Sequence, residues 1–193
     1  MTSGEEPVLF KPCDVFLTRS HSFLGRAIRF ATRSFGESRS MVNHVGIMVS
    51  EGSVEEAEGV EALTTVKRHS LWKQYGPGNS SDVAVYRPLN LTDDEKALIV
   101  AAAEGYVGRT YGYLKIAAHL KDWLFLGIYF FRRMTRMDDY PICSWLVAQA
   151  FAKADRTFGV PPGMASPDDI WDFVTSNPDK YQAVHPLGPL DRQ

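Results

Sequence analysis

Cysteine is scarce in this chain of 193 residues, which contains only Cys13 and Cys143. Two cysteines make no disulfide framework, and we expect both thiols to be reduced. An excess of either charge is also missing, since 21 basic residues face 23 acidic ones and the formal net charge is −2. That balance argues against a protein that binds nucleic-acid backbones, so we expect no nucleic-acid partner.

Long hydrophobic runs and targeting signals are absent as well. The longest apolar run begins at Trp123 and ends at Phe131, whereas a helix that spans a bilayer needs roughly 20 residues. The N-terminal sequence MTSGEEPVLF has neither the basic nor the apolar region of a signal peptide. We therefore expect a cytoplasmic protein without a transmembrane helix.

The apolar run from Trp123 to Phe131 leaves two interpretations open. Basic residues follow it at Arg132, Arg133 and Arg136, and they suit the C-terminal end of a core helix. The alternative is a lid or an interfacial helix near lipid, which would give the protein a peripheral membrane contact. A run of this length is more typical of a core helix.

The composition predicts a single folded domain. Hydrophobic residues make up 45% of the chain and aromatic residues 12%, which is typical of a globular protein rather than a disordered one. The length suits one domain with a sizeable core. We predict a flexible N-terminal arm over residues 1–11 and one domain over residues 12–193.

Local patterns predict strands mainly in the first half of the chain and helices mainly in the second. Strands are expected at residues 15–17, 44–49, 53–57, 59–66, 83–87 and 181–185, with a tight turn at Glu51-Gly52. Helices are expected at residues 22–33, 93–108, 113–134 and 143–154, and from 167 onward, with capping signals at Thr92 and Ser166. This segregation predicts an α+β fold in which a small antiparallel sheet packs against helices.

Cys143 is the first candidate for chemistry. It opens the segment CSWLVAQAFAKA, which is apolar almost all round and therefore predicts a buried helix. Unpaired N–H groups and the positive end of the dipole at a helix N-terminus favour a thiolate, which is the nucleophilic form of cysteine. The alternative is that Cys143 is a small buried hydrophobic residue. We interpret Cys13, which has no helix behind it, as structural.

A base and an orienting acid are expected on the neighbouring strands. His44 begins an apolar strand and is the candidate that takes the proton of the thiol, although a structural histidine is the alternative. Glu56 is the candidate that orients the imidazole. It lies in a run rich in acids, so Glu55 or Glu58 are alternative partners, and the run is also consistent with a solvated face.

Four further residues are candidates for substrate binding. They are Tyr111, Tyr140, Ser144 and Asn43. The two tyrosines would line a pocket or donate to an oxyanion, although packing roles are the alternative. The remaining histidines show no metal-ligand spacing, and the chain has no HExxH, CxxC or phosphate-binding glycine loop, so we expect no metal and no cofactor.

The order of these motifs resembles a known family. The segment NHVGI is followed by VEEAEGV, then by a G-x-x-Y-G turn and by Cys-Ser at the start of an apolar helix. The opening CDVFL and the late SPDDI are similar to the family's first strand and last helix start. Together these motifs resemble the circularly permuted NlpC-type papain-like proteins, which include YiiX/YebB-like proteins and, more distantly, lecithin:retinol acyltransferase-like enzymes. The resemblance covers roughly residues 12–185 and depends on motif order, since each motif alone is weak.

The resemblance implies a function and assigns roles. It implies a permuted papain-like fold with Cys143 as nucleophile, His44 as general base and Glu56 as orienting acid. The reaction would be thioester-forming hydrolysis of a peptide or amide, as on cell-wall peptides. Alternatives are a lipid-directed acyltransferase or esterase of the same fold, and a binding module that retains the fold without catalysis. A partner-binding protein that uses residues 118–131 is a further alternative.

Overall fold

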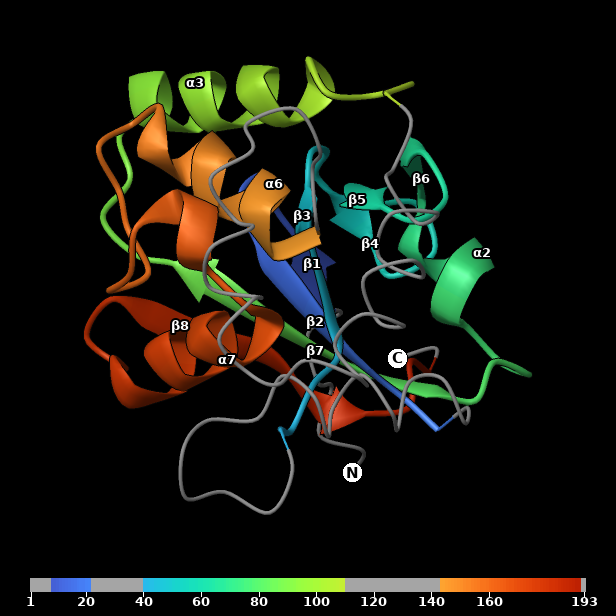
Figure 1. Cartoon of the computed structure of the whole chain (residues 1–193). Coiled ribbons are helices and arrows are strands. Elements are labelled where there is room, and N and C mark those ends of the chain that lie inside the picture. Colours follow the sequence, from blue (N-terminus) through green and yellow to red (C-terminus); the bar gives the residue numbers. More distant parts are fainter. Residues whose placement is uncertain (1–7, 22–39, 110–142, 192–193) are drawn as a thin grey trace, which may run out of the picture.

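The structure, a computed structural model, describes residues 8–21, 40–109 and 143–191. Six antiparallel strands form the main sheet in the order β6-β5-β3-β2-β7-β8 (Figure 1). These strands are β2 Val15–Ser20, β3 His44–Met48, β5 Glu58–Ala62, β6 Val66–Ser70, β7 Ser81–Pro88 and β8 Tyr181–Gly188. A second, two-stranded sheet pairs β1 Leu9–Phe10 with β4 Gly52–Ser53.

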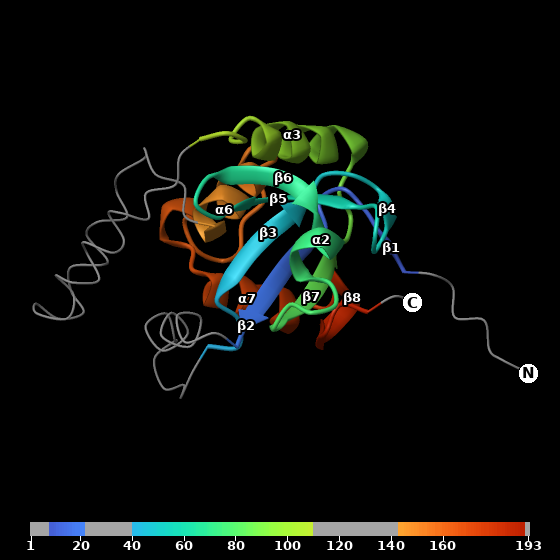
Figure 2. The same cartoon turned by 90° about the vertical axis from the view of Figure 1, so that its right-hand side faces the viewer.

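Helices cover both faces of the main sheet (Figure 2). The helices are α2 Leu71–Tyr75, α3 Asp93–Glu104, α6 Cys143–Ala152 and α7 Pro167–Ser176, with a short 3-10 helix η1 at Pro162–Met164. Helices α3, α6 and α7 lie on one side, and the short α2 lies on the other. The predicted α+β class and the antiparallel sheet packed against helices are therefore confirmed.

Alternation along β2 builds the two halves of the core. Val15 and Leu17 pack into the cluster beneath α3, α6 and α7, whereas Phe16 packs into the cluster beneath α2. Successive side chains of a strand point to opposite faces, so a fully apolar stretch predicts a strand covered on both sides. Phe16 also explains a close approach on β3, because a Cβ on Gly46 would lie 2.2 Å from the Phe16 ring.

The helix starts follow the predicted capping signals. The Thr92 hydroxyl accepts from the Glu95 N–H, and the Glu95 carboxylate accepts from the Thr92 N–H, which forms a capping box. Ser166 and Asp169 make the same reciprocal pair at α7, with Pro167 in the first turn. Helix α3 ends at Glu104, before the predicted Gly108, because its C-cap is Gly105.

The predicted hairpin at Glu51-Gly52 is wrong. Strand β3 pairs with β5 rather than with residues 53–57. Gly52 and Ser53 instead form β4 against β1, and the residues that follow them make a turn. The longer connection moves the strand that faces His44 several residues down the chain, which changes the partner expected for this histidine.

The predicted flexible arm is wrong for its last residues. Leu9 and Phe10 form β1, and Phe10 is fully buried. The preceding residues 1–7 and the predicted helices at 22–33 and 113–134 lie outside the described residues. Within the described part of the chain, no helix has the length and apolar character needed to cross a membrane.

Candidate functional site

Glu61 is the centre of a buried polar cluster on the α2 side of the sheet. In the pairing of β5 with β3, Glu61 lies opposite Gly46, so His44 is its diagonal neighbour on the same face. In the pairing with β6, Glu61 lies opposite Lys67, so His69 is its diagonal neighbour on the other side. The sheet therefore places one carboxylate between two imidazoles.

Three side chains contact this carboxylate, which has no exposed surface. His44 Nε2 and the Tyr75 hydroxyl both contact Glu61 Oε2, the latter donating a hydrogen bond at 2.6 Å. His69 Nε2 lies 2.6 Å from Glu61 Oε1. A buried carboxylate is stable only when partners compensate for the loss of water, and here they come from β3, β6 and α2.

Cys143 is the first residue of α6 and is 5% exposed. Helix α6 packs against β3 and β5, which brings its N-terminus to the start of β3. The thiol interacts with the His44 side chain and with the backbone N–H groups of Val45 and Ser144. Since Glu61 occupies Nε2 of His44, the ring nitrogen that remains for the thiol is Nδ1.

The electrostatics of this group favour a thiolate–imidazolium pair. Burial by itself would raise the pKa of Cys143, but the His44 charge and the nearby N–H groups lower that pKa below its usual value. Burial would lower the pKa of His44, but the charges of Cys143 and Glu61 raise it to about 10. Burial would raise the pKa of Glu61, but its hydrogen-bonded partners lower it to about 2. The Cys143 thiol and the His44 imidazole therefore titrate together as a pair.

The thiol of Cys13 differs from that of Cys143 in its surroundings and in its pKa. Burial and the neighbouring Asp14 charge raise the pKa of its thiol to about 12. Its sulfur donates to the Lys96 carbonyl oxygen at 3.6 Å. Cys13 also has a φ of +73°, in the left-handed region where glycine is the usual residue. The structure therefore agrees with the interpretation of Cys13 as a buried structural residue.

Glu56 does not contact His44, so its predicted position beside the imidazole is wrong. It lies in the turn after β4, where its carboxylate accepts from the Ser53 hydroxyl at 3.1 Å. The two alternatives are wrong as well, since Glu55 is exposed and Glu58 pairs with Arg68. The physical reason is the register of the sheet, which places Glu61 on the face of His44.

The predicted substrate-binding residues divide into two groups. Tyr111 and Tyr140 lie outside the described residues, as does the apolar run from Trp123 to Phe131. Ser144 is buried, and its backbone N–H contacts the Cys143 sulfur. A substrate-binding role stays a prediction for all four residues.

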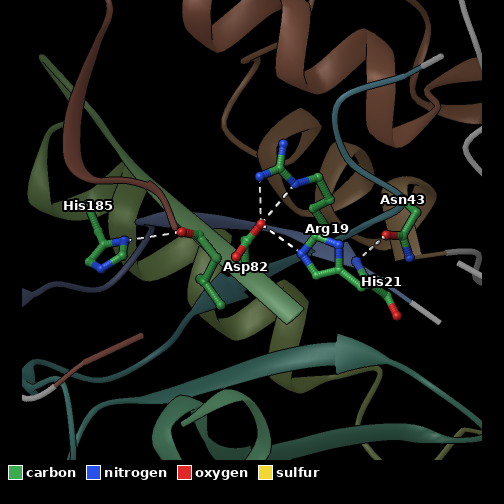
Figure 3. A network of polar contacts seen from close by, with 7 residues as sticks. Arg19, His21, Asn43, Asp82 and His185 are labelled. Carbon is green, nitrogen blue, oxygen red and sulfur yellow. Dashed lines mark hydrogen bonds and ion pairs between the residues drawn. The ribbon is translucent and has the colours of Figure 1, made fainter. Parts of the chain in front are cut away.

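Asn43 anchors the chain directly before His44. Its Oδ1 accepts from the Ser20 N–H at 2.7 Å, which ties the start of β3 to the end of β2 (Figure 3). Next to it, Asp82 Oδ2 accepts from Arg19 Nε and Nη2 at 2.9 and 2.6 Å, which joins β2 to β7. These contacts fix the end of the sheet from which the His44 side chain projects.

The described part of the chain contains no set of side chains arranged as metal ligands. No group of three or more histidine, cysteine, aspartate or glutamate side chains there has an arrangement suited to a metal ion. In the cluster around Glu61, the imidazole nitrogens contact the carboxylate oxygens directly. The arrangement is therefore suited to holding and moving protons.

The chain has structural similarity to solved proteins. No family model matches the chain, and no curated protein matches it. The chain is similar to the crystal structure of metalloprotein yiiX from Escherichia coli O157:H7, with 22% sequence identity and a TM-score of 0.48. The match covers 75% of this chain and 66% of that one. The fold assignment depends on the sheet and helices described above rather than on this likeness.

Sequence reasoning missed Glu61, His69 and Tyr75. A signal for Glu61 exists, because it is the one charged residue between Gly59 and Leu63 in a segment that is otherwise apolar. A charged residue inside a buried strand indicates a paired site. No comparable local signal marks His69 or Tyr75, since their roles arise from pairing across β5 and from the position of α2.

Proposed function

We propose that this protein is a cysteine-dependent hydrolase with Cys143 as nucleophile, His44 as general base and acid, and Glu61 as the residue that orients His44. The observation that carries the proposal is the continuous buried series of contacts from the Cys143 thiol through His44 to Glu61. A nucleophile, a base and an orienting carboxylate in this order are the parts that acyl transfer requires.

The proposed reaction uses the ion pair as its resting state. The Cys143 thiolate attacks a carbonyl carbon, and the imidazolium of His44 donates its Nδ1 proton to the leaving group as that bond breaks. Backbone N–H groups at the start of α6 are suited to hold the oxyanion, each contributing about 3 kcal/mol to transition-state binding. His44 then takes a proton from water, which attacks the thioester; the carbon–sulfur bond breaks, the acid is released and the thiolate–imidazolium pair is restored. Glu61 keeps Nε2 protonated and the ring fixed throughout.

The topology supports a permuted papain-like arrangement for this chain. A helix that begins with cysteine packs against an antiparallel sheet, and the histidine strand comes before that helix in the sequence. His44 therefore precedes Cys143 along the chain, which is the reverse of the papain order. The proposed substrate is a peptide or another amide. The alternative substrate is an ester, including a lipid ester bound with help from residues 123–131, and both substrate classes are to be assayed.

Alkylation of the native protein tests the proposal. A neutral alkylating reagent in limiting amount would be applied from pH 5 to 9, with peptide mass spectrometry to measure labelling of Cys143 and Cys13. The pH of half-maximal rate is the quantity to compare, because reagent access scales the rate without shifting this midpoint. We expect the midpoint of Cys143 to lie below the usual pKa of a cysteine thiol, and no comparable labelling of Cys13.

The variant His44→Ala provides the decisive comparison. Without the imidazolium, burial dominates and raises the pKa of the Cys143 thiol, so the midpoint should move to higher pH. The wild-type protein would then be screened with amide and ester substrates, and acyl-enzyme formation would be measured by intact mass. An inert Cys143, or a midpoint that is the same in His44→Ala, would refute the catalytic proposal and favour a binding module of the same fold.

A further inference from the structure

His69 contacts the same carboxylate as the proposed base but from the opposite side. It lies on β6, which flanks β5, and its side chain is 18% exposed. Its Nε2 is 2.6 Å from Glu61 Oε1, whereas His44 contacts Oε2. Neither Glu61 Oε1 nor His69 Nε2 has a well-aligned hydrogen bond among the described residues, so each depends on this close ion-pair contact.

The surroundings of the ring define its protonation state. Nδ1 lies 3.1 Å from the Ser70 carbonyl oxygen, which can only accept a hydrogen bond. Nε2 faces a carboxylate oxygen, which also only accepts while Glu61 is ionised. A neutral imidazole carries a single N–H and would leave one nitrogen lone pair against an oxygen lone pair. This geometry favours protons on both nitrogens, that is, the imidazolium form of His69.

We propose that His69 is a positively charged positioning residue of this site, which holds Glu61 Oε1 so that Oε2 faces His44. The proposal rests on the function proposed above. It gives the buried cluster two positive and two negative charges, namely the imidazoliums of His44 and His69, the Glu61 carboxylate and the Cys143 thiolate. Such a balance reduces the cost of burying four ionised groups.

Two further polar groups flank the cluster, Tyr75 and Arg68. Tyr75 from α2 donates to Glu61 as a neutral phenol, because burial and the Glu61 charge raise the pKa of its hydroxyl. Next to His69 on β6, Arg68 is engaged with Glu58 and Glu104 at the surface. Glu61 is therefore the anion that His69 meets directly.

Loss of the His69 proton would release the carboxylate. A deprotonated Nε2 would be an electron-rich atom 2.6 Å from Oε1, and the repulsion would turn the carboxylate away from His44. Burial and the nearby His44 charge lower the pKa of His69, but Glu61 and the Ser70 carbonyl outweigh them and raise it. The surroundings therefore favour the imidazolium form of His69.

Histidine-selective 15N NMR of the full-length protein tests the charge directly. At pH 7 we expect both ring nitrogens of His69 to be protonated, with a titration midpoint above that of an ordinary histidine. In Glu61→Gln the midpoint should fall, because the neutral amide no longer favours the imidazolium. A His69 that is neutral at pH 7 in the wild type, or one whose midpoint is the same in Glu61→Gln, would overturn the proposal.

Alkylation of Cys143 tests the positioning role. His69→Leu keeps the approximate size but removes both donors, and we expect it to slow Cys143 labelling at pH 6 by about tenfold. His69→Gln restores a donor without a titrating group and should return the rate to within about threefold of wild type. The matched control is His185→Leu. Like His69, His185 has Nδ1 3.1 Å from a backbone carbonyl, that of Val83, but it lies on β8 at the other end of the sheet. We expect it to leave the rate unchanged.

The outcomes separate the two proposals. An inert Cys143 in the wild type refutes the hydrolase and the positioning role with it. A reactive Cys143 whose pH profile is the same in wild type, His69→Leu and His69→Gln refutes the role of His69 alone. If His69→Leu does not fold, the wild-type NMR titration and the rate in His69→Gln decide the question.

Discussion

Replacement of Glu61 by glutamine isolates the electrostatic centre of the site. The amide has the shape of the carboxylate and can still accept from Tyr75, but it has lost the negative charge that His44 contacts. Glu61 is fully buried, so water cannot replace that charge. We expect the pKa of His44 to fall, since the carboxylate is one of the two charges that raise it to about 10.

The size of the fall follows from the strength of the contact. A hydrogen bond to a charged group contributes about 1.5–3 kcal/mol, and one pKa unit corresponds to about 1.4 kcal/mol. The pKa of His44 should therefore fall by about 1 to 2 units in Glu61→Gln. It should stay above the ordinary histidine value, because the Cys143 thiolate still faces the ring.

Histidine NMR titration between pH 6 and 11 measures this change. Glu56→Gln is the matched control, because Glu56 is exposed, contacts Ser53 and lies away from the imidazole. It should leave the His44 titration unaltered while making the same change in formal charge. A His44 pKa that is unchanged in Glu61→Gln, or that falls equally in both variants, would refute the reasoning from the buried contact.

Three further predictions concern stability. Burial would raise the pKa of Glu61, but its partners lower it to about 2. Its ionisation therefore contributes about 3 kcal/mol to the free energy of unfolding, which is present above pH 4.5 and lost as the pH falls through 2. Urea unfolding from pH 2.5 to 6 should show the difference in stability between wild type and Glu61→Gln narrowing at the acid end. Gly46→Ala should destabilise the fold by about 1–3 kcal/mol, because its Cβ would lie 2.2 Å from the Phe16 ring, whereas Gly105→Ala, with its nearest atom at 3.3 Å, should be close to neutral in thermal unfolding. Thr92→Ala should lower the free energy of unfolding by about 1 kcal/mol. Thr92→Ser should retain most of the wild-type stability, and urea denaturation measures both variants.

Features that depend on neighbouring residues were predictable from the sequence. The capping boxes at Thr92 and Ser166 are complete within four residues, and both helices begin where those signals place them. The helix that opens with Cys143 follows from its apolar surface, and it is buried as expected. Such elements are specified locally, because a cap or an apolar face needs only a turn or two of chain.

The partner of His44 was not predictable in the same way. Its identity depends on the strand register, and the register depends on where the chain turns after β3. The short β4 strand pairs with β1, and this pairing lengthens the connection before β5. Because β1 precedes β4 by about forty residues, no pattern near Glu51 reveals it. The assignment of Glu56 was therefore an error in topology rather than in chemistry, since the expected glutamate is present five residues further on.

The energetic cost of the Glu61 cluster is itself an argument for function. Apolar side chains of similar volume would fill the same space without the desolvation of a carboxylate and two imidazoles, and replacing buried ion pairs in this way is often neutral or stabilising. The nearest neighbours of Glu61 in β5, which are Gly59, Val60 and Ala62, are glycine or apolar, so the fold does not need a charge at this buried position. Glu61 is disfavoured by burial, contacts two histidines and lies one imidazole away from the Cys143 thiol. This arrangement supports the proposal that the cluster serves to favour the thiolate.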